Sequence, residues 1–317
     1  MHYRDYSTYL KETYGEKVYK LPISLSDVKC PNRDGSISFG GCSFCDASGS
    51  GFQCLPNEWT ITAQLTENRD FYHKRFGAEK FIAYLQSYTN TYLPFSRFQE
   101  VIEEICAFPD LVGIAISTRP DCVNEQYLSY LSHTAQSRKF DIDIELGLQT
   151  VNYRTLAAVN RGHSLAEYID AVIRIKKYHL TTTAHVILNL PGDEMIDVIE
   201  TAKILSALDV DAVKLHSLYI VGGTALAKSY VRGEFEVISP EEYIERAVTF
   251  LEYLHKDVII QRLVGKGPKD NLIFGNWDSS WWKIKDAIED ELIRKNSYQG
   301  KKCDYLNGHA LKFEAQS

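Results

Sequence analysis

Six consecutive pairs of segments, each a predicted strand followed by a predicted helix, constrain the fold of this 317-residue chain more than any other feature. The strands are apolar or alternating runs, and the helices carry apolar residues at helical spacing. We expect the strands at 18–25, 81–86, 111–117, 140–149, 181–190 and 212–220, and the helices at 59–76, 95–108, 125–132, 165–178, 194–208 and 241–254. Regular alternation of this kind predicts parallel strands covered by helices.

Such alternation is compatible with either a barrel or a doubly wound sheet. Nucleotide-binding sheets carry G-x-G-x-x-G or G-x-x-x-x-G-K-[ST] after a strand, and this chain has neither motif there. A complete barrel needs eight strand–helix units. We therefore predict an α/β fold with a partial, six-stranded (β/α)6 TIM-like barrel over 1–255, which includes a short N-terminal cap. A C-terminal extension follows at 256–317, with 258–263 as a candidate further strand.

A loop rich in glycine and short polar residues follows the first predicted strand and contains Cys30, Cys42 and Cys45 in the spacing C-x11-C-x2-C. Three thiolates on a pliable loop suit an iron–sulfur cluster, and in a cube-shaped cluster they would leave one iron open to chemistry. Cys54 leaves two other interpretations open, a cluster closed by a fourth ligand and a structural zinc site with four cysteines. Thiols without any metal are a further alternative. A disulfide is not expected, because the seven cysteines are an odd number and the polar N-terminus shows no secretory signal.

Composition limits the location and the partners of the chain. No apolar run approaches the length of a membrane span, so we expect a cytoplasmic protein that binds no membrane. The net charge of −7 argues against indiscriminate nucleic-acid binding but allows a local basic groove. The C-terminal stretch combines Trp277, Trp281 and Trp282 with the basic residues Arg262, Lys266, Lys269, Lys283, Lys285, Arg294, Lys295, Lys301 and Lys302. That mixture suits single-stranded RNA, whereas seven acidic residues between Asp270 and Asp304 equally favour an amphipathic helix and strand that close the barrel.

Polar clusters follow the predicted strands at their carboxyl ends, where barrels of this type carry their active sites. Beyond the cysteine loop these clusters span 86–91, 117–121, 145–150, 185–193 and 214–224. Each cluster alone has an ordinary structural explanation, since a single histidine is more often a packed, hydrogen-bonded core residue than a ligand. Their recurrence at all six strand ends indicates a site at the mouth of the barrel.

With these clusters in place, the sequence resembles the radical S-adenosylmethionine (SAM) enzymes. Within them it is similar to the YhcC/YtqA-like family, which is related to the catalytic subunit of Elongator and more distantly to coproporphyrinogen dehydrogenase. The resemblance runs from about residue 15 to residue 265 and is carried by CPNRDGSISFGGCSFC at 30–45, QSYTNTY at 86–92, STRPDC at 117–122, ELGLQT at 145–150, NRGHS at 160–164, HVILNLPGDE at 185–194 and VKLHSLYIVGGT at 213–224.

The resemblance implies two cofactors, a [4Fe–4S] cluster held by the three loop cysteines and a SAM molecule that chelates the fourth iron. Cys54 is outside the family pattern and is interpreted as a bystander, and the x11 gap is longer than the common x3. The segment at 86–90 replaces the Gly-Gly-Glu triplet of most relatives. The cofactor-binding positions implied are Phe44 beside the adenine, Gln86, Tyr88, Thr89, Arg119, Glu145, Gln149, Lys176 as a partner of the SAM carboxylate, and His185 and His216 as cofactor or substrate contacts.

The resemblance also implies a reaction. The reduced cluster would cleave SAM to a 5′-deoxyadenosyl radical, which abstracts a hydrogen atom from the substrate. The expected substrate is tRNA, modified on the C5 side chain of the wobble uridine, for example from carboxymethylaminomethyl towards aminomethyl. An electron donor such as flavodoxin or ferredoxin would be a second partner. Two alternatives stay open: a radical SAM enzyme for a small molecule or peptide, and a non-catalytic metal-binding or partner-binding protein on a degenerate barrel.

Overall fold

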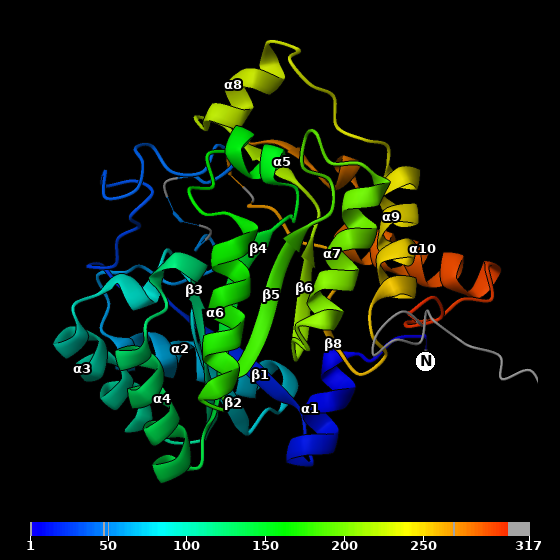
Figure 1. Ribbon diagram of the computed structural model, residues 1–317. Coiled ribbons are helices and arrows are strands. Elements are labelled where there is room, and N and C mark those ends of the chain that lie inside the picture. The colour runs from blue at the N-terminus through cyan, green and yellow to red at the C-terminus, as the bar shows by residue number, and fades with distance from the viewer. Residues whose placement is uncertain (1, 47, 50, 269, 304–317) are drawn as a thin grey trace, which may run out of the picture.

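The computed structural model describes residues 2–46, 48–49, 51–268 and 270–303. A curled sheet of parallel strands forms its centre, in the order β1-β2-β3-β4-β5-β6-β8. These strands are β1 (Val18–Ile23), β2 (Lys80–Leu85), β3 (Leu111–Thr118), β4 (Asp141–Gln149), β5 (Thr181–Ile187), β6 (Ala212–His216) and β8 (Ile259–Arg262). Strands β1 and β8 are the two edges and do not pair with each other, so the sheet is a half-barrel (Figure 1).

The predicted partial barrel is confirmed, but its sheet has seven strands where six were expected. The additional strand, β8, corresponds to the candidate at 258–263 and pairs in parallel with β6. Only Ile259 and Ile260 of its four residues are buried, so its apolar signal is short. The last strand of the barrel thus lies after residue 255, within the segment that the sequence analysis assigned to the C-terminal extension. The division into a barrel and an extension stays a prediction.

Helices cover the outer face of the sheet, as Figure 1 shows. They are α2 (Ile61–Phe76), α3 (Phe95–Cys106), α4 (Glu125–Arg138), α6 (Leu165–Lys177), α7 (Met195–Ala207) and α9 (Pro240–Tyr253). Helix α6 illustrates why they pack there: Tyr168, Ala171, Val172 and Ile175 are all buried at helical spacing against the sheet. Its start is set by a capping box between Ser164 and Glu167. The main hydrophobic core therefore lies between sheet and helices, and the carboxyl ends of the strands stay free for loops.

The predicted strand at 212–220 is two strands in the structure. After β6, the short β7 (Tyr219–Val221) leaves the main sheet and pairs antiparallel with β9 (Leu272–Gly275). Side chains redirect the chain between them: the Ser217 hydroxyl donates to Asn276, and the Leu218 N–H donates to the Asn189 side chain at 2.7 Å. A run of apolar residues does not reveal such a change of sheet.

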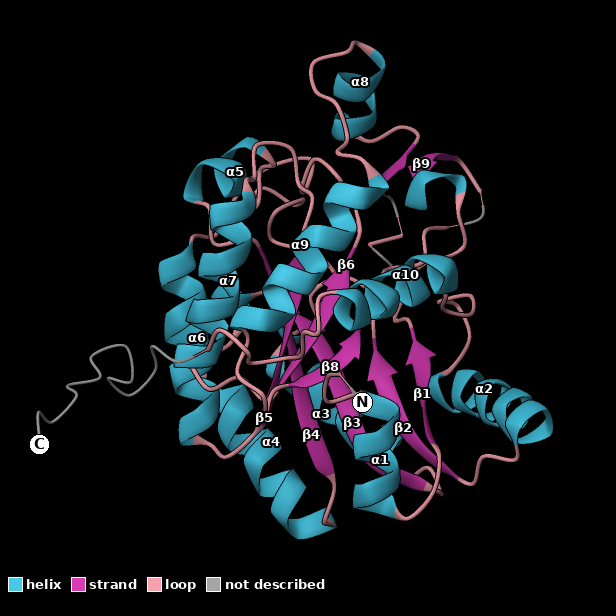
Figure 2. Cartoon of the chain, turned by 90° about the vertical axis from the view of Figure 1, so that its right-hand side faces the viewer, coloured by secondary structure: helices cyan, strands magenta, loops and turns pink. Residues whose placement is uncertain are grey.

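Four α-helices of the described residues lie outside this outer layer of helices. Helix α1 (Tyr6–Tyr14) contacts both edge strands, while α5 (Tyr153–Ala158) and α8 (Ala225–Val231) lie above the carboxyl ends. Helix α10 (Trp281–Arg294) packs against α9 (Figure 2). No helix in the described ranges is both long and apolar enough to cross a membrane.

Helix α10 has a buried apolar face, and several charges in and just after it form ion pairs. Its buried face consists of Ile284, Ile288 and Leu292. Lys285 pairs with Glu289 at 2.7 Å, and Glu291 pairs with Arg294 at 2.6 Å and with Lys295 at 3.3 Å. This pattern agrees with the expected amphipathic helix. Lys269 and Asp304 lie outside the described residues.

Candidate active site at the barrel mouth

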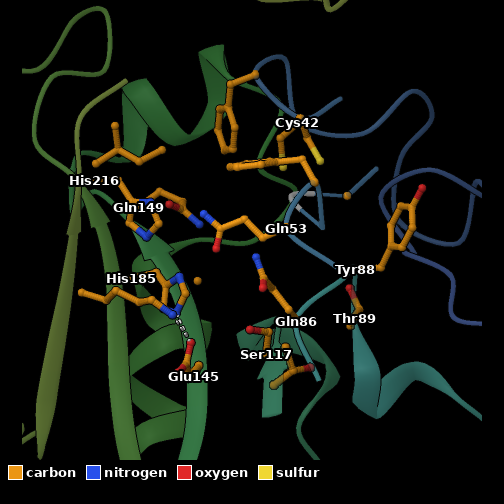
Figure 3. A pocket seen from close by; sticks show the side chains of 18 of the residues that line it. Cys42, Gln53, Gln86, Tyr88, Thr89, Ser117, Glu145, Gln149, His185 and His216 are labelled. Carbon is orange, nitrogen blue, oxygen red and sulfur yellow. Dashed lines mark hydrogen bonds and ion pairs between the residues drawn. The ribbon is translucent and has the colours of Figure 1, made fainter. Parts of the chain in front are cut away.

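A cavity of about 380 Å³ lies at the carboxyl ends of the strands, under the cysteine loop. The structure brings together here every site residue expected from the sequence except Lys176. They are Cys30, Cys42, Cys45, Phe44, Gln86, Tyr88, Thr89, Arg119, Glu145, Gln149, His185 and His216. Figure 3 shows His185, His216 and Gln149 on one side of this cavity and Gln86, Tyr88 and Thr89 on another, with Cys42 above them.

The three loop cysteines line the same cavity, and two polar side chains donate hydrogen bonds to the sulfur of Cys42. The Cys42 thiol accepts hydrogen bonds from Arg161 Nη1 at 3.4 Å and from Asn32 Nδ2 at 3.6 Å. Burial and the neighbouring Cys42 raise the pKa of Cys45 to about 11. A coordinating metal removes the proton from such a thiol, so these sulfurs are available to a metal in spite of that pKa.

The donor set fits a cluster with three protein ligands. Among the described residues, no three His, Cys, Asp or Glu side chains converge on the position of a single metal ion. A cube-shaped cluster carries its irons at separate corners, so its thiolates need not meet at one point. Cys54 is not part of the cavity lining; its sulfur lies 3.7 Å from Ser87 Oγ and 4.0 Å from Gln86 Oε1.

Arg119 offers an unused donor at the cysteine end of the cavity. Two of its nitrogens hold the Asp121 carboxylate at 2.7 and 2.9 Å, whereas Nη1 is buried without a hydrogen-bond partner among the described residues. A buried donor without a partner costs about 1–3 kcal/mol, so such groups usually face a ligand. Its position near Cys30 and Cys42 suits an anionic cofactor group such as the SAM carboxylate.

A carboxylate with several cationic partners forms the floor of the cavity. Glu145 on β4 is buried and accepts hydrogen bonds from Lys20 on β1, from Lys214 on β6 at 2.9 Å and from His185 on β5 at 2.6 Å (Figure 3). Burial alone would raise the pKa of Glu145, but Lys20 and Lys214 outweigh it and hold that pKa well below its usual value. Burial and Lys214 lower the pKa of His185 to about 4, so its imidazole is neutral.

Several lining residues were not predicted, because they lie within strands or in the middle of loops. Lys20 is a charged residue inside a largely apolar strand. The sequence shows this exception, and it could have indicated a functional lysine. Tyr84 on β2 accepts a hydrogen bond from Lys214 at 3.0 Å and lies 3.0 Å from the Ser117 hydroxyl. Gln53 reaches into the cavity from the cysteine loop (Figure 3). None of these three residues belongs to the polar clusters that directly follow a strand, so the search for such clusters could not find them.

Backbone geometry at the end of β4 orients Arg161 towards the cysteines. The strand is irregular between Gly147 and Gln149, and Gln149 has a left-handed φ of 77°. The Gly147 carbonyl accepts hydrogen bonds from Arg161 Nη2 at 2.7 Å and from His163 Nε2 at 3.0 Å. A Cβ at Gly147 would come within 2.6 Å of Arg161 Nη2, so a larger residue here would displace the Arg161 guanidinium from its present position. Strained positions of this kind concentrate at functional sites.

The structure places Lys176 away from the cavity, contrary to the expectation that it binds the SAM carboxylate. It lies on α6 next to the buried stripe, with a side-chain exposure of 33%, and pairs with Asp209 at 3.0 Å. A helical residue that follows the buried Ile175 points away from the sheet. Lys176 resembles a basic position of related enzymes in sequence, but in this structure its side chain does not line the cavity.

We therefore expect Lys176→Ala to change the SAM dissociation constant by less than about twofold, because Lys176 does not line the cavity. The loss of its exposed ion pair with Asp209 should also change the stability of the fold very little. Isothermal titration of the reconstituted protein measures the dissociation constant. Arg119→Gln is the matched comparison inside the cavity, and we expect it to weaken SAM binding about tenfold or more. Equal weakening by both substitutions would contradict the placement of Lys176.

Comparison with known proteins identifies the family of the chain. The Radical SAM superfamily model matches residues 30–205, and the Radical_SAM C-terminal domain model matches 210–294. YtqA of Bacillus subtilis is 35% identical over 299 residues, which cover 94% of this chain and 92% of YtqA. YhcC of Escherichia coli K12 is 30% identical over 291 residues, which cover 92% of each chain. The chain belongs to the radical SAM superfamily, whose members bind a [4Fe–4S] cluster and SAM.

More distant similarity is found to a tRNA uridine(34) acetyltransferase and to a solved Elp3 structure. A tRNA uridine(34) acetyltransferase of Methanocaldococcus jannaschii is 29% identical over 219 residues, which cover 68% of this chain and 36% of that protein. The solved structure of Methanocaldococcus infernus Elp3 with an N-terminal deletion has a TM-score of 0.67 and 17% identity, and it covers 89% of this chain and 64% of that chain. The structural similarity to Elp3 supports the assignment of the fold.

Proposed function

We propose that this radical SAM enzyme modifies the wobble uridine of tRNA, by converting a carboxymethylaminomethyl group on C5 towards aminomethyl. The observation that carries the proposal is the charge of the cavity: Glu145 is the one carboxylate among its lining residues. Facing it are the basic residues Lys20, Arg33, Arg119, Arg161, Lys214, Arg262 and Lys266. Such a cavity suits a polyanionic substrate whose modified group itself carries a carboxylate. Similarity to the tRNA uridine(34) acetyltransferase gives further support.

In this proposal the loop cysteines Cys30, Cys42 and Cys45 would hold the cluster. When bound, the cluster and SAM supply a 5′-deoxyadenosyl radical. An electron donor such as flavodoxin or ferredoxin would reduce the cluster. Arg161 would stabilise the Cys42 thiolate by its hydrogen bond. The remaining cofactor contacts would come from Phe44, Gln86, Tyr88, Thr89, Arg119 and Gln149. The protein positions the substrate carbon and excludes other hydrogen donors.

The proposed conversion has a definite stoichiometry. One carboxymethylaminomethyl group, one water and one SAM would give one aminomethyl group, glyoxylate, methionine, 5′-deoxyadenosine and a proton. The substrate carbon loses two electrons, and SAM is the oxidant that accepts them together with the abstracted hydrogen. No other oxidant is needed.

The test is a reaction of the anaerobically reconstituted protein with SAM, a chemical reductant and tRNA that carries 5-carboxymethylaminomethyluridine. We expect 5-aminomethyluridine in the digested tRNA, with glyoxylate and 5′-deoxyadenosine in equal amounts by mass spectrometry. Transcribed tRNA without modifications is the control and should give none of these products above background. An unchanged nucleoside profile, together with an unchanged profile in a strain that lacks the gene, would overturn the proposal.

A further inference from the structure

We propose that Arg262, Lys214 and His216 form a subsite for the carboxylate of the substrate side chain, at the strand end of the cavity. This inference rests on the proposed function for the identity of the substrate. The subsite itself is argued from the charges and contacts of the chain.

The charges at the floor of the cavity leave Arg262 without a counterion. Lys20 and Lys214 share Glu145, and Lys20 also lies 3.6 Å from Asp143. Two lysines therefore face two carboxylates. Arg262 contacts the Leu215 carbonyl at 3.4 Å and the His216 ring at 2.6 Å, and it makes no ion pair with any residue in the described part of the chain. A partly buried guanidinium without a carboxylate is costly unless a ligand supplies one.

The surroundings of Arg262 all favour an added negative charge. Burial lowers the pKa of Arg262, and burial together with Arg262 lowers the pKa of His216 well below its usual value. Burial also lowers the pKa of Lys214 to about 8, in spite of Glu145. A bound carboxylate would relieve the mutual repulsion of these groups. The planar fork of arginine matches the two oxygens of a carboxylate.

This subsite is separate from the place of the SAM carboxylate. Arg119, with its unpaired Nη1, has the thiols of Cys30 and Cys42 among its neighbours. The charged and polar neighbours of Arg262 are instead Tyr84, Tyr219, Glu145 and Tyr243. The two arginines thus line one cavity but have different neighbours. His216 lies beside His185 at 5.2 Å between ring centres, below the cysteine loop (Figure 3).

The first arm of the test uses iminodiacetate, which carries the carboxymethylamino group, as a probe of the purified protein. We expect the probe to raise the thermal unfolding midpoint of the wild type, and Arg262→Gln to raise the probe dissociation constant about tenfold or more. Arg262→Lys keeps the charge and should retain part of the binding. Arg154→Gln, an exposed arginine that contacts Tyr153, removes the same charge outside the cavity and should leave probe binding unchanged. Circular dichroism of each variant shows that the fold is intact.

The second arm compares anticodon stem-loops that carry either 5-carboxymethylaminomethyluridine or 5-aminomethyluridine. The wild type should prefer the carboxylate-bearing RNA about tenfold or more, and Arg262→Gln should remove that preference. Unchanged probe binding in Arg262→Gln would overturn the subsite. Weakening of SAM to the same degree as iminodiacetate, or tighter Arg262-dependent binding of inorganic phosphate, would overturn its assignment to the substrate carboxylate. If neither RNA binds or reacts with the wild type, the proposed function fails, while the iminodiacetate arm still decides the subsite.

Discussion

Replacement of Cys42 by alanine is expected to remove the visible iron–sulfur absorbance of the reconstituted protein and to reduce 5′-deoxyadenosine formation to background. Cys42 is buried, and its sulfur is the acceptor for both Arg161 and Asn32. No other described residue could take over this position, because Cys54 is directed towards Ser87 and Gln86. Iron content per chain, the absorbance band and the rate of SAM cleavage measure the effect.

Cys54→Ser is the matched control for this prediction. We expect it to retain the iron content and the absorbance of the wild type, because Cys54 does not line the cavity. Loss of the cluster in Cys54→Ser would contradict the three-ligand assignment and favour the cluster closed by a fourth cysteine. Retention of a complete cluster in Cys42→Ala would contradict the whole proposal for the cysteine loop.

Replacement of Glu145 by glutamine is expected to lower the free energy of unfolding by about 3–5 kcal/mol at neutral pH, because it leaves buried cations without their carboxylate. Lys20, Lys214 and His185 all donate to Glu145 in the structure. Urea denaturation followed by circular dichroism measures the change. Glu200→Gln makes the same chemical change in the exposed pair with Lys203 and should cost less than about 1 kcal/mol.

The pH dependence of the same variant provides a sharper test. The folded pKa of Glu145 lies well below its ordinary value of 4.5, so its ionisation stabilises the folded protein above that value. The contribution is lost as the pH falls towards the folded pKa. The wild type should therefore lose its advantage over Glu145→Gln in acid, and the two unfolding curves should approach each other below about pH 4. A constant difference down to pH 2 would show that Glu145 contributes by packing and not by charge.

The sequence was sufficient to predict the layers of the fold, because the apolar patterns that define helices and strands are periodic and local. The stripe on α6, Tyr168, Ala171, Val172 and Ile175, predicts both the helix and the face that it buries. Parallel strands connected by helices bring their carboxyl ends to one edge, so His185 and Arg119 could be expected at a common site. The expectation for Lys176 came from the resemblance alone, and a resemblance in sequence does not report which side of a helix faces the cavity.

The tertiary structure alone decided which charges meet inside the barrel. Lys20 and Glu145 are 125 positions apart, and Lys214 and Glu145 are 69 apart, so no local pattern relates them. The strand β8 was weak in the sequence, yet it places Arg262 beside His216. Strand register and the curl of the sheet determine these contacts, because they set which inward-facing side chains share one lumen. The sequence by itself determined the layers and the cysteine loop, whereas the electrostatic floor of the site exists only once the seven strands are assembled.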